Sequence, residues 1–284
     1  SKLLSNRTIG IIKNTTAEQQ DGLPSCLLPN KNKTSALVRD VLRKASSASA
    51  PLLPLPVMSL GLPKCGSSTL FQFFDCVGLQ TTHHHKKTRY FEGLCMRDAV
   101  NAGLPPIQTC GPRTDAFMQF DVEYPFGFAT YRYAGKNFIS ITQRDDCFLP
   151  QLSLLDEIHA ENPNVTFVMN FRPIHDWIKS VEGWNTLLQR FQACHLPNLP
   201  RGHPNKDVVR SNKDALVATM AHFVCSHVQH VRNFVEAYPS HALIELDLYD
   251  MDHSRSVMSA LFPSLKKNSS SSECWGHANK SHKK

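Results

Sequence analysis

Residues 55–77 contain a short apolar run, a glycine-bounded loop and an amphipathic segment, in that order. The run LPVMSL has the length of a buried strand and stops at Gly61. From Ser67 to Val77, apolar residues recur three and four positions apart, which predicts a helix with one apolar face. A strand, a tight turn and a helix in this order open an α/β unit, so this segment strongly constrains the fold.

The rest of the chain continues the alternation. Helices are predicted at 151–163, from 173 to about 191, at 213–238 and at 255–262, and strands at 165–171 and 241–248. The run VTFVMNF (165–171) is mostly apolar, as in a parallel strand buried on both faces. We therefore predict one three-layer α/β domain with a mainly parallel sheet over residues 53–284. Within it, segment 104–145 is rich in Pro, Gly and aromatic residues, and we expect an insertion with short strands around the substrate.

Residues 1–52 are predicted to form a flexible, disordered stem, since polar and small residues dominate and no apolar period is sustained. The net charge of the chain is +7, but the basic excess lies in this stem and in residues 266–284. Binding to a nucleic-acid backbone needs basic side chains clustered on the folded surface, so no nucleic-acid partner is expected. No apolar run is long enough to span a membrane, and any membrane attachment is expected to come from an N-terminal anchor outside this sequence.

The chain has nine cysteines and six Asn-x-Ser/Thr sequons, which together favour an oxidising secretory-pathway lumen. No two cysteines have Cys-x-x-Cys spacing, so no metal site is predicted. Cys95 and Cys110 flank a loop with Gly and Pro and are the first choice of disulfide pair. The sequons begin at Asn6, Asn14, Asn32, Asn164, Asn268 and Asn279.

The loop G61-L-P-K-C-G66 has two glycines that flank four residues, which is the spacing of the nucleotide-binding G-x4-G-K-[ST] loop. Backbone N–H groups of such a loop and of the following helix point at an anion. Lys64 adds a positive charge, and the hydroxyls of Ser67, Ser68 and Thr69 add hydrogen bonds. Ser67 stands where ATP-binding loops have their lysine, and no acidic partner for Mg²⁺ is evident, which disfavours ATP chemistry.

The segment Pro63-Lys64-Cys65-Gly66-Ser67-Ser68 resembles the 5′-phosphosulfate loop of the sulfotransferases, which reads P-K-x-G-[ST]-[ST] between the first strand and helix. The resemblance covers residues 55–280 and implies 3′-phosphoadenylyl sulfate as donor co-substrate, without a metal. It implies that the donor binds the side chains and backbone of Lys64, Cys65, Gly66, Ser67, Ser68 and Thr69, and that Lys64 also acts in catalysis by stabilising the leaving phosphate oxygen.

In this family an arginine at a strand end and a serine eight residues later hold the 3′-phosphate of the donor. Arg172 ends the run 165–171 and Ser180 follows eight residues later, so the resemblance assigns them this role. A guanidinium and a hydroxyl suit a dianionic phosphate. Pro173 comes one place earlier than in the usual R-D-P or R-N-P pattern. The segment C274-W-G-H-A-N-K280 resembles part of the late loop of lumenal carbohydrate sulfotransferases, which implies a donor contact for Lys280.

Transfer to a hydroxyl or amine needs a base, which in the family is a His or Glu just after the second strand. Aligning Tyr90-Phe91 with the family's aromatic pair puts Lys87 where some members have the glutamate. We predict His83, nearest the expected strand end, as the base, because imidazole titrates near neutrality. The alternatives are His84 and His85, followed by Glu92, Asp115 and Asp121.

The resemblance thus implies a Golgi-lumenal sulfotransferase that acts on a glycan or another secreted acceptor. A member of the same fold that binds nucleotide or glycan without catalysis and an ATP-dependent kinase remain alternatives. Cys65 is expected to stay unpaired, since a disulfide would pin a loop that has to fit the phosphosulfate, and Cys274 is expected to tie down the late loop.

Overall fold

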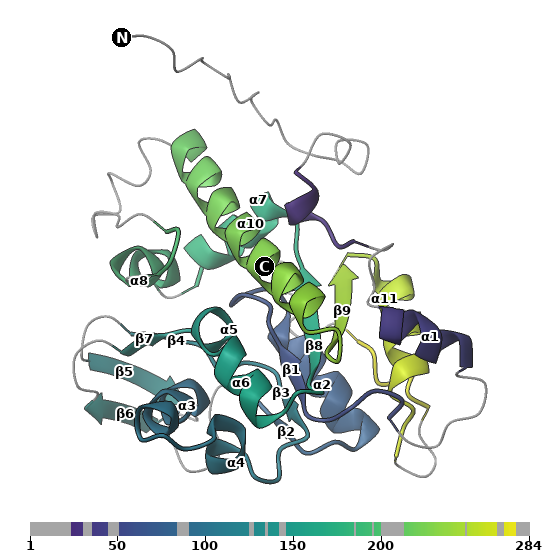
Figure 1. The fold of residues 1–284 in the computed structure, drawn as a ribbon. Coiled ribbons are helices and arrows are strands. Elements are labelled where there is room, and N and C mark those ends of the chain that lie inside the picture. Colours follow the sequence, from purple (N-terminus) through teal and green to yellow (C-terminus); the bar gives the residue numbers. More distant parts are fainter. Residues whose placement is uncertain are drawn as a thin grey trace, which may run out of the picture.

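The computed structural model describes residues 24–30, 36–44, 51–83, 91–124, 128–133, 136–141, 146–184, 186–194, 196–199, 213–247, 249–265 and 270–276. Five parallel strands form a central sheet in the order β2-β3-β1-β8-β9 (Figure 1). The strands are β2 (Thr81–Thr82), β3 (Ala116–Phe117), β1 (Val57–Ser59), β8 (Thr166–Phe171) and β9 (Ala242–Asp247). The central position of β1 places the segment that follows it in the middle of the molecule.

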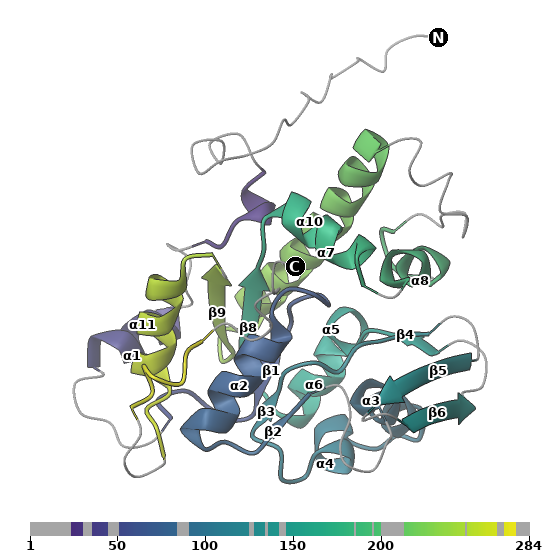
Figure 2. The ribbon, with the colours of Figure 1, turned by 180° about the vertical axis from the view of Figure 1, so that it is seen from behind.

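Helices cover both faces of the sheet. Helices α10 (Lys213–Ala237) and α6 (Leu155–Glu161) lie on the face seen in Figure 1, and α2 (Ser67–Val77) and α11 (Met251–Leu261) lie on the face seen in Figure 2. A hydrophobic core lies on each face of the sheet, and successive residues of β8 point into opposite cores. Phe167 packs in the core beneath α10, and Val168 packs in the core beneath α2. The predicted α/β class with a parallel sheet is therefore confirmed, with helices as the two outer layers.

An insertion follows β2 at one edge of the sheet, and β3 of the central sheet interrupts it. It contains α3 (Glu92–Asn101), α4 (Pro106–Cys110), β4 (Val122–Tyr124), β5 (Phe128–Tyr133), β6 (Lys136–Ile141) and β7 (Asp146–Phe148). Strand β4 pairs with β7 and β5 with β6, both antiparallel. The prediction of short strands in this part of the chain is confirmed, and the last of them, β7, lies just beyond the predicted end at residue 145.

Two helices that the sequence predicts as continuous are interrupted. The first divides at Leu154 into α5 (Pro150–Ser153) and α6. The second divides into α7 (Ile174–Glu182) and α8 (Leu187–Ala193), because Gly183 ends α7 and Thr186 takes a left-handed conformation with φ 62°. Trp184 has the spacing of an apolar residue of the predicted helix, but it lies in the connection between α7 and α8 and is half exposed.

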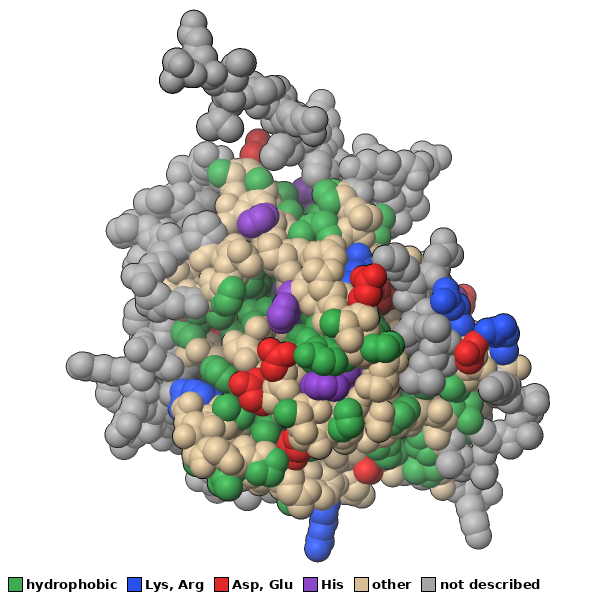
Figure 3. Space-filling view, in the orientation of Figure 1, with side chains coloured by type: hydrophobic (Ala, Val, Ile, Leu, Met, Phe, Trp, Pro, Cys, Tyr) green, Lys and Arg blue, Asp and Glu red, His purple; other side chains and the backbone are tan. Residues whose placement is uncertain are grey.

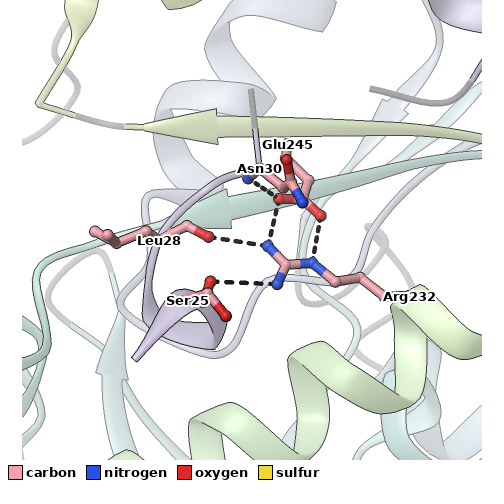
Figure 4. A network of polar contacts seen from close by, with 5 residues as sticks. All are labelled: Ser25, Leu28, Asn30, Arg232 and Glu245. Carbon is pink, nitrogen blue, oxygen red and sulfur yellow. Dashed lines mark hydrogen bonds and ion pairs between the residues drawn. The ribbon is translucent and has the colours of Figure 1, made fainter. Parts of the chain in front are cut away.

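Two segments of the predicted stem pack on the domain. The 3-10 turn η2 (Ser25–Leu27) adjoins α10, and α1 (Ala36–Lys44) packs against α11 through the buried Val38. Arg232 of α10 donates hydrogen bonds to the carbonyls of Ser25 and Leu28, and pairs with Glu245 of β9 (Figure 4). The boundary expected at residue 52 therefore does not separate these two segments from the domain, and other parts of 1–52 lie outside the described residues.

Four disulfides join described residues: Cys26–Cys225, Cys76–Cys274, Cys95–Cys110 and Cys147–Cys194. The predicted pair Cys95–Cys110 and the unpaired state of Cys65 are confirmed. The Cys76–Cys274 bond ties residues 270–276 to helix α2, and Lys280 lies outside the described residues. Such a set of disulfides fits a secretory or extracellular compartment.

The described part of the chain has no helix that is both long and apolar enough to cross a membrane. On the face that carries α10, Lys and Arg side chains of the described residues are few and scattered (Figure 3). The view shows acidic, His and hydrophobic side chains interspersed there.

Candidate functional site

The loop between β1 and α2, residues 61–66, is called the glycine loop below. Lys64 and Gly66 both have positive φ, 71° and 90°, and Gly66 is the residue that precedes the first turn of α2. Left-handed residues in such a turn bring successive backbone N–H groups to one side, which forms a concave anion site. The first N–H groups of α2 open toward the same loop because a helix N-terminus has no carbonyls one turn earlier.

Side chains behind the loop hold its carbonyl oxygens. His227 donates to Leu60 (2.7 Å), Trp177 to Pro63 (2.8 Å), Arg172 to Lys64 (3.1 Å), and Asn170 to Cys65. The donors come from α10, α7 and the end of β8, so three elements converge on a stretch of six residues. Because the N–H and C=O of a peptide unit point in opposite directions, carbonyls held from behind turn the neighbouring amides toward the open side. The amides of Gly61, Lys64 and Gly66 are therefore turned to that side, whereas the Cys65 N–H binds the Leu62 carbonyl within the loop at 3.1 Å.

Gly61 is required by the same packing. A Cβ atom at this position would lie 2.1 Å from Oδ1 of Asn170, too close for any other residue. Asn170 also accepts a hydrogen bond from the Ser59 hydroxyl at 3.2 Å. Asn170 could have been noticed in the sequence as an amide in an otherwise mostly apolar strand.

Lys64 carries the positive charge of the loop. Its Nζ lies 3.6 Å from the ring centroid of Trp184, which is 51% exposed. Burial and then repulsion from Arg172 lower the pKa of Lys64 from its usual value. Both effects disfavour the ammonium in the absence of a counter-charge, so an anion at the loop would be well matched to it.

Arg172 directly follows β8, and Ser180 lies in the last turn of α7. The Nη1 of Arg172 binds the Lys64 carbonyl, whereas its buried Nε has no hydrogen-bond partner among the described residues. Ser180 is partly buried on α7, one turn after Asp176, which accepts a hydrogen bond from Tyr249 at 2.8 Å. Burial, followed by this bond, raises the pKa of Tyr249. Tyr249 could not be predicted from a local pattern, because its contact with Asp176 depends on how the chain after β9 meets α7.

His83 reaches the glycine loop from the other side. It follows β2, and its Nε2 lies 3.1 Å from Oγ of Ser67, the first residue of α2. Ser67 in turn donates to Oε1 of Gln119 at 3.1 Å. The structure thus places the predicted base next to the predicted donor loop, whereas His84, His85 and Lys280 lie outside the described residues.

The three reserve carboxylates differ in position. Glu92 is buried and accepts from the Thr82 hydroxyl at 2.9 Å, and Asp115 accepts from the backbone of Gln80 at 2.9 Å, so both have structural roles at the strand ends. Asp121 is buried and accepts from Nε2 of Gln119 at 3.2 Å, which connects it to the loop.

A small pocket of about 20 Å³, partly open to solvent, lies behind the glycine loop on the α10 side. Its lining includes Leu27, Cys65, Arg172, Trp177 and His227. Burial lowers the pKa of His227 to about 4, so this imidazole is neutral at physiological pH. Its position on the apolar stripe of α10 was the signal that the sequence offered for a buried histidine.

Among the described residues, no group of three or more His, Cys, Asp or Glu side chains is arranged to hold a metal ion. No family model matches the chain, and neither a curated protein nor a solved structure matches it.

Proposed function

We propose that the protein is a sulfotransferase that moves a sulfuryl group from 3′-phosphoadenylyl sulfate to a hydroxyl or amine, with the glycine loop as a phosphate-binding P-loop. The observation that carries the proposal is the set of four carbonyls in residues 60–65 held from behind by His227, Trp177, Arg172 and Asn170. This set supports an anion site on the open side of the loop, after the central strand β1.

The residues then have distinct roles. The N–H groups and hydroxyls of residues 66–69 bind the 5′-phosphosulfate, and Lys64 neutralises the charge that develops on the leaving phosphate oxygen. Arg172 and Ser180 hold the 3′-phosphate, with Lys280 as a further contact. The acceptor oxygen attacks sulfur, its proton passes to His83, and the bond between sulfur and the phosphate oxygen breaks. The products are the sulfated acceptor and adenosine 3′,5′-bisphosphate.

The proposed acceptor is a glycan or another secretory-pathway molecule, and the proposed location is the Golgi lumen. The four disulfides support a compartment of this kind. Asn164, the first residue of a sequon, is exposed at the end of the loop before β8 and is accessible to glycosylation. Membrane attachment would come from an N-terminal anchor outside this sequence.

Titration with nucleotides tests the proposal. Adenosine 3′,5′-bisphosphate should bind the wild-type protein in calorimetry, and ATP with Mg²⁺ should not. The reverse preference would favour the kinase alternative. Turnover of radiolabelled 3′-phosphoadenylyl sulfate with a panel of glycan acceptors then separates an enzyme from a protein that binds nucleotide without catalysis. Absence of binding to either nucleotide would contradict the proposal.

A further inference from the structure

The three tryptophans of the chain all lie in its described parts, and Trp184 is the one that is not buried. An exposed aromatic residue by itself needs no explanation. This ring, however, lies over the charged group of the glycine loop. Nζ of Lys64 is 3.6 Å from the ring centroid, well within the distance of about 6 Å over which an aromatic face attracts a cation. The proposed mechanism gives Trp184 no role.

Helix α7 and the turn after it set the position of this ring. The N–H of Trp184 donates to the Val181 carbonyl at 3.3 Å, and the Trp184 carbonyl accepts from the N–H of Leu187 at 2.7 Å. Two helical turns earlier, Trp177 donates to the Pro63 carbonyl at 2.8 Å. The same side of this segment therefore places two indole rings against neighbouring residues of the glycine loop, and the backbone on both sides of Trp184 is held.

The chemical nature of this partner matters for the charge of Lys64. Among the residues that the structure describes, no carboxylate forms an ion pair with Lys64, and the charged group that acts on it is Arg172, of the same sign. A carboxylate in the place of Trp184 would neutralise the ammonium and compete with an anionic ligand. An indole attracts the cation through its ring quadrupole and carries no net charge, so the positive charge stays available.

We propose that Trp184 is a positioning residue for Lys64: its indole holds the ammonium at the glycine loop without neutralising it, so that the charge is in place when the phosphosulfate of the donor arrives. The identity of that anion rests on the proposed function. A lysine side chain has four flexible carbons, and the ring restricts the conformations that they sample before the donor binds. The ring covers one side of the ammonium, and the anion approaches from the other.

Carbon and proton NMR of the full chain labelled with ¹³C-lysine tests the contact itself. The Cε methylene is bonded to Nζ and lies near the ring, whose circulating electrons shift protons above its face upfield. The Lys64 signal is identified as the one lost in Lys64→Met. We expect this signal upfield of the other lysines in the wild-type protein. Trp184→Leu should return it to the ordinary lysine position, whereas Trp184→Phe keeps an aromatic face and should leave it upfield.

Calorimetry with adenosine 3′,5′-bisphosphate tests the positioning role. Trp184→Leu should lower the affinity roughly 2- to 10-fold, because the Lys64 side chain then has to be ordered when the nucleotide binds. Trp184→Phe should recover most of this loss. The matched control is the same Trp184→Leu change made in a Lys64→Met protein, where no ammonium remains to be held and no further loss of affinity is expected.

A Lys64 signal at the ordinary lysine position in the wild-type protein would overturn the inference, and so would a Trp184→Leu variant that binds the nucleotide as tightly as the wild type or more tightly. An equal loss of affinity in the Lys64→Met protein would show that the ring acts on the fold and not on the ammonium. An upfield signal that depends on Trp184, in a protein that binds no nucleotide, would contradict the proposed function. Nucleotide binding that does not depend on Trp184 would contradict the positioning role alone.

Discussion

At the scale of single residues, Lys64 combines a charge that the proposed function uses with an unfavourable backbone conformation. Its φ of 71° lies in the left-handed region, which costs a non-glycine residue roughly 1–2 kcal/mol. The Arg172 bond to its carbonyl and the contact of its ammonium with Trp184 help to hold it there. A lysine kept at a position that suits glycine indicates that the charge matters more than local stability.

Two variants of Lys64 separate the charge from the backbone. Lys64→Ala and Lys64→Gly both remove the ammonium. Both should therefore lower the affinity for adenosine 3′,5′-bisphosphate by roughly 10- to 150-fold, the equivalent of about 1.5–3 kcal/mol of binding free energy. Lys64→Gly should be the more stable of the two by about 1 kcal/mol in denaturant unfolding, since glycine accepts the positive φ. Lys179→Ala removes an exposed lysine from nearby α7 as a control. Equal nucleotide affinity in the wild type and both variants would refute the role of Lys64.

Arg172→Ala tests the second phosphate contact. Because Arg172 also holds the Lys64 carbonyl, some affinity should be lost for every nucleotide that uses the loop. The loss should be at least tenfold greater for adenosine 3′,5′-bisphosphate than for adenosine 5′-phosphosulfate, which lacks the 3′-phosphate, because one charge-assisted contact contributes about 1.5–3 kcal/mol. Calorimetry with the two ligands gives this ratio. A ratio of one would leave Arg172 with a structural role alone.

The candidate site residues that could be predicted from the sequence are those that belong to a short local pattern. The glycine spacing, Lys64 and the three hydroxyls lie in one nine-residue stretch, and the strand-end position of Arg172 follows from an apolar run. His227 and Gln119 were missed, because each meets the loop or the first residue of α2 only after α10 or the insertion has packed. Local patterns therefore predicted the position of the glycine loop, whereas the groups that hold and orient it depend on tertiary contacts.

At the scale of elements, a buried ion pair joins α10 to β9, and its arginine also donates hydrogen bonds to the segment around η2. The Arg232 and Glu245 side chains are 14% and 3% exposed, and their closest atoms are 2.7 Å apart. Arg232→Met would leave the Glu245 charge buried without its partner, and the free energy of unfolding should fall by about 3–5 kcal/mol. Arg255→Met is the control: it breaks the exposed pair with Asp252 and should cost less than about 1 kcal/mol.

A double variant completes this test. Arg232→Met combined with Glu245→Leu removes both charges. The double variant should therefore lose clearly less free energy of unfolding than the sum of the losses in the two single variants. Urea unfolding of the four proteins gives the coupling. Additive losses would mean that Arg232 and Glu245 do not stabilise each other.

A buried histidine of helix α10, His227, makes the stability of the domain depend on pH. The pKa of His227 is about 4 in the folded protein and near 6.5 when unfolded, so the unfolded chain binds the proton more readily. Stability from this group is present above pH 6.5 and is lost as the pH falls toward 4, by about 3 kcal/mol between pH 7 and pH 4. His227→Gln retains a donor for the Leu60 carbonyl without titrating, so its unfolding free energy should depend less on pH over this window. The exposed His222→Gln on the same helix is the control, and identical pH profiles for wild type and His227→Gln would contradict the assignment.

At the scale of the whole molecule, the disulfides connect the periphery to the central domain. Cys26–Cys225 and Cys76–Cys274 span 199 and 198 residues, and join the η2 segment to α10 and the C-terminal segment to α2. Cys147–Cys194 joins the insertion to the end of α8. Cys65 alone among the nine cysteines is free, and it is buried in the glycine loop, where burial raises the pKa of its thiol to about 12. The molecule therefore separates structural cysteines from one thiol at the site.

Counting thiols in the protein purified from a secretory expression host tests this arrangement. The native protein should take up no alkylating reagent at pH 8, since the Cys65 thiol is both buried and protonated. Unfolding without reductant should expose one thiol, and unfolding with reductant should expose all nine. Cys65→Ser should give none before reduction, which identifies the single label. More than one label in the unreduced, unfolded wild-type protein would show that one of the four disulfides is absent. Rapid labelling of the native protein would show that the glycine loop opens to solvent far more than its packing against Asn170 and Arg172 implies.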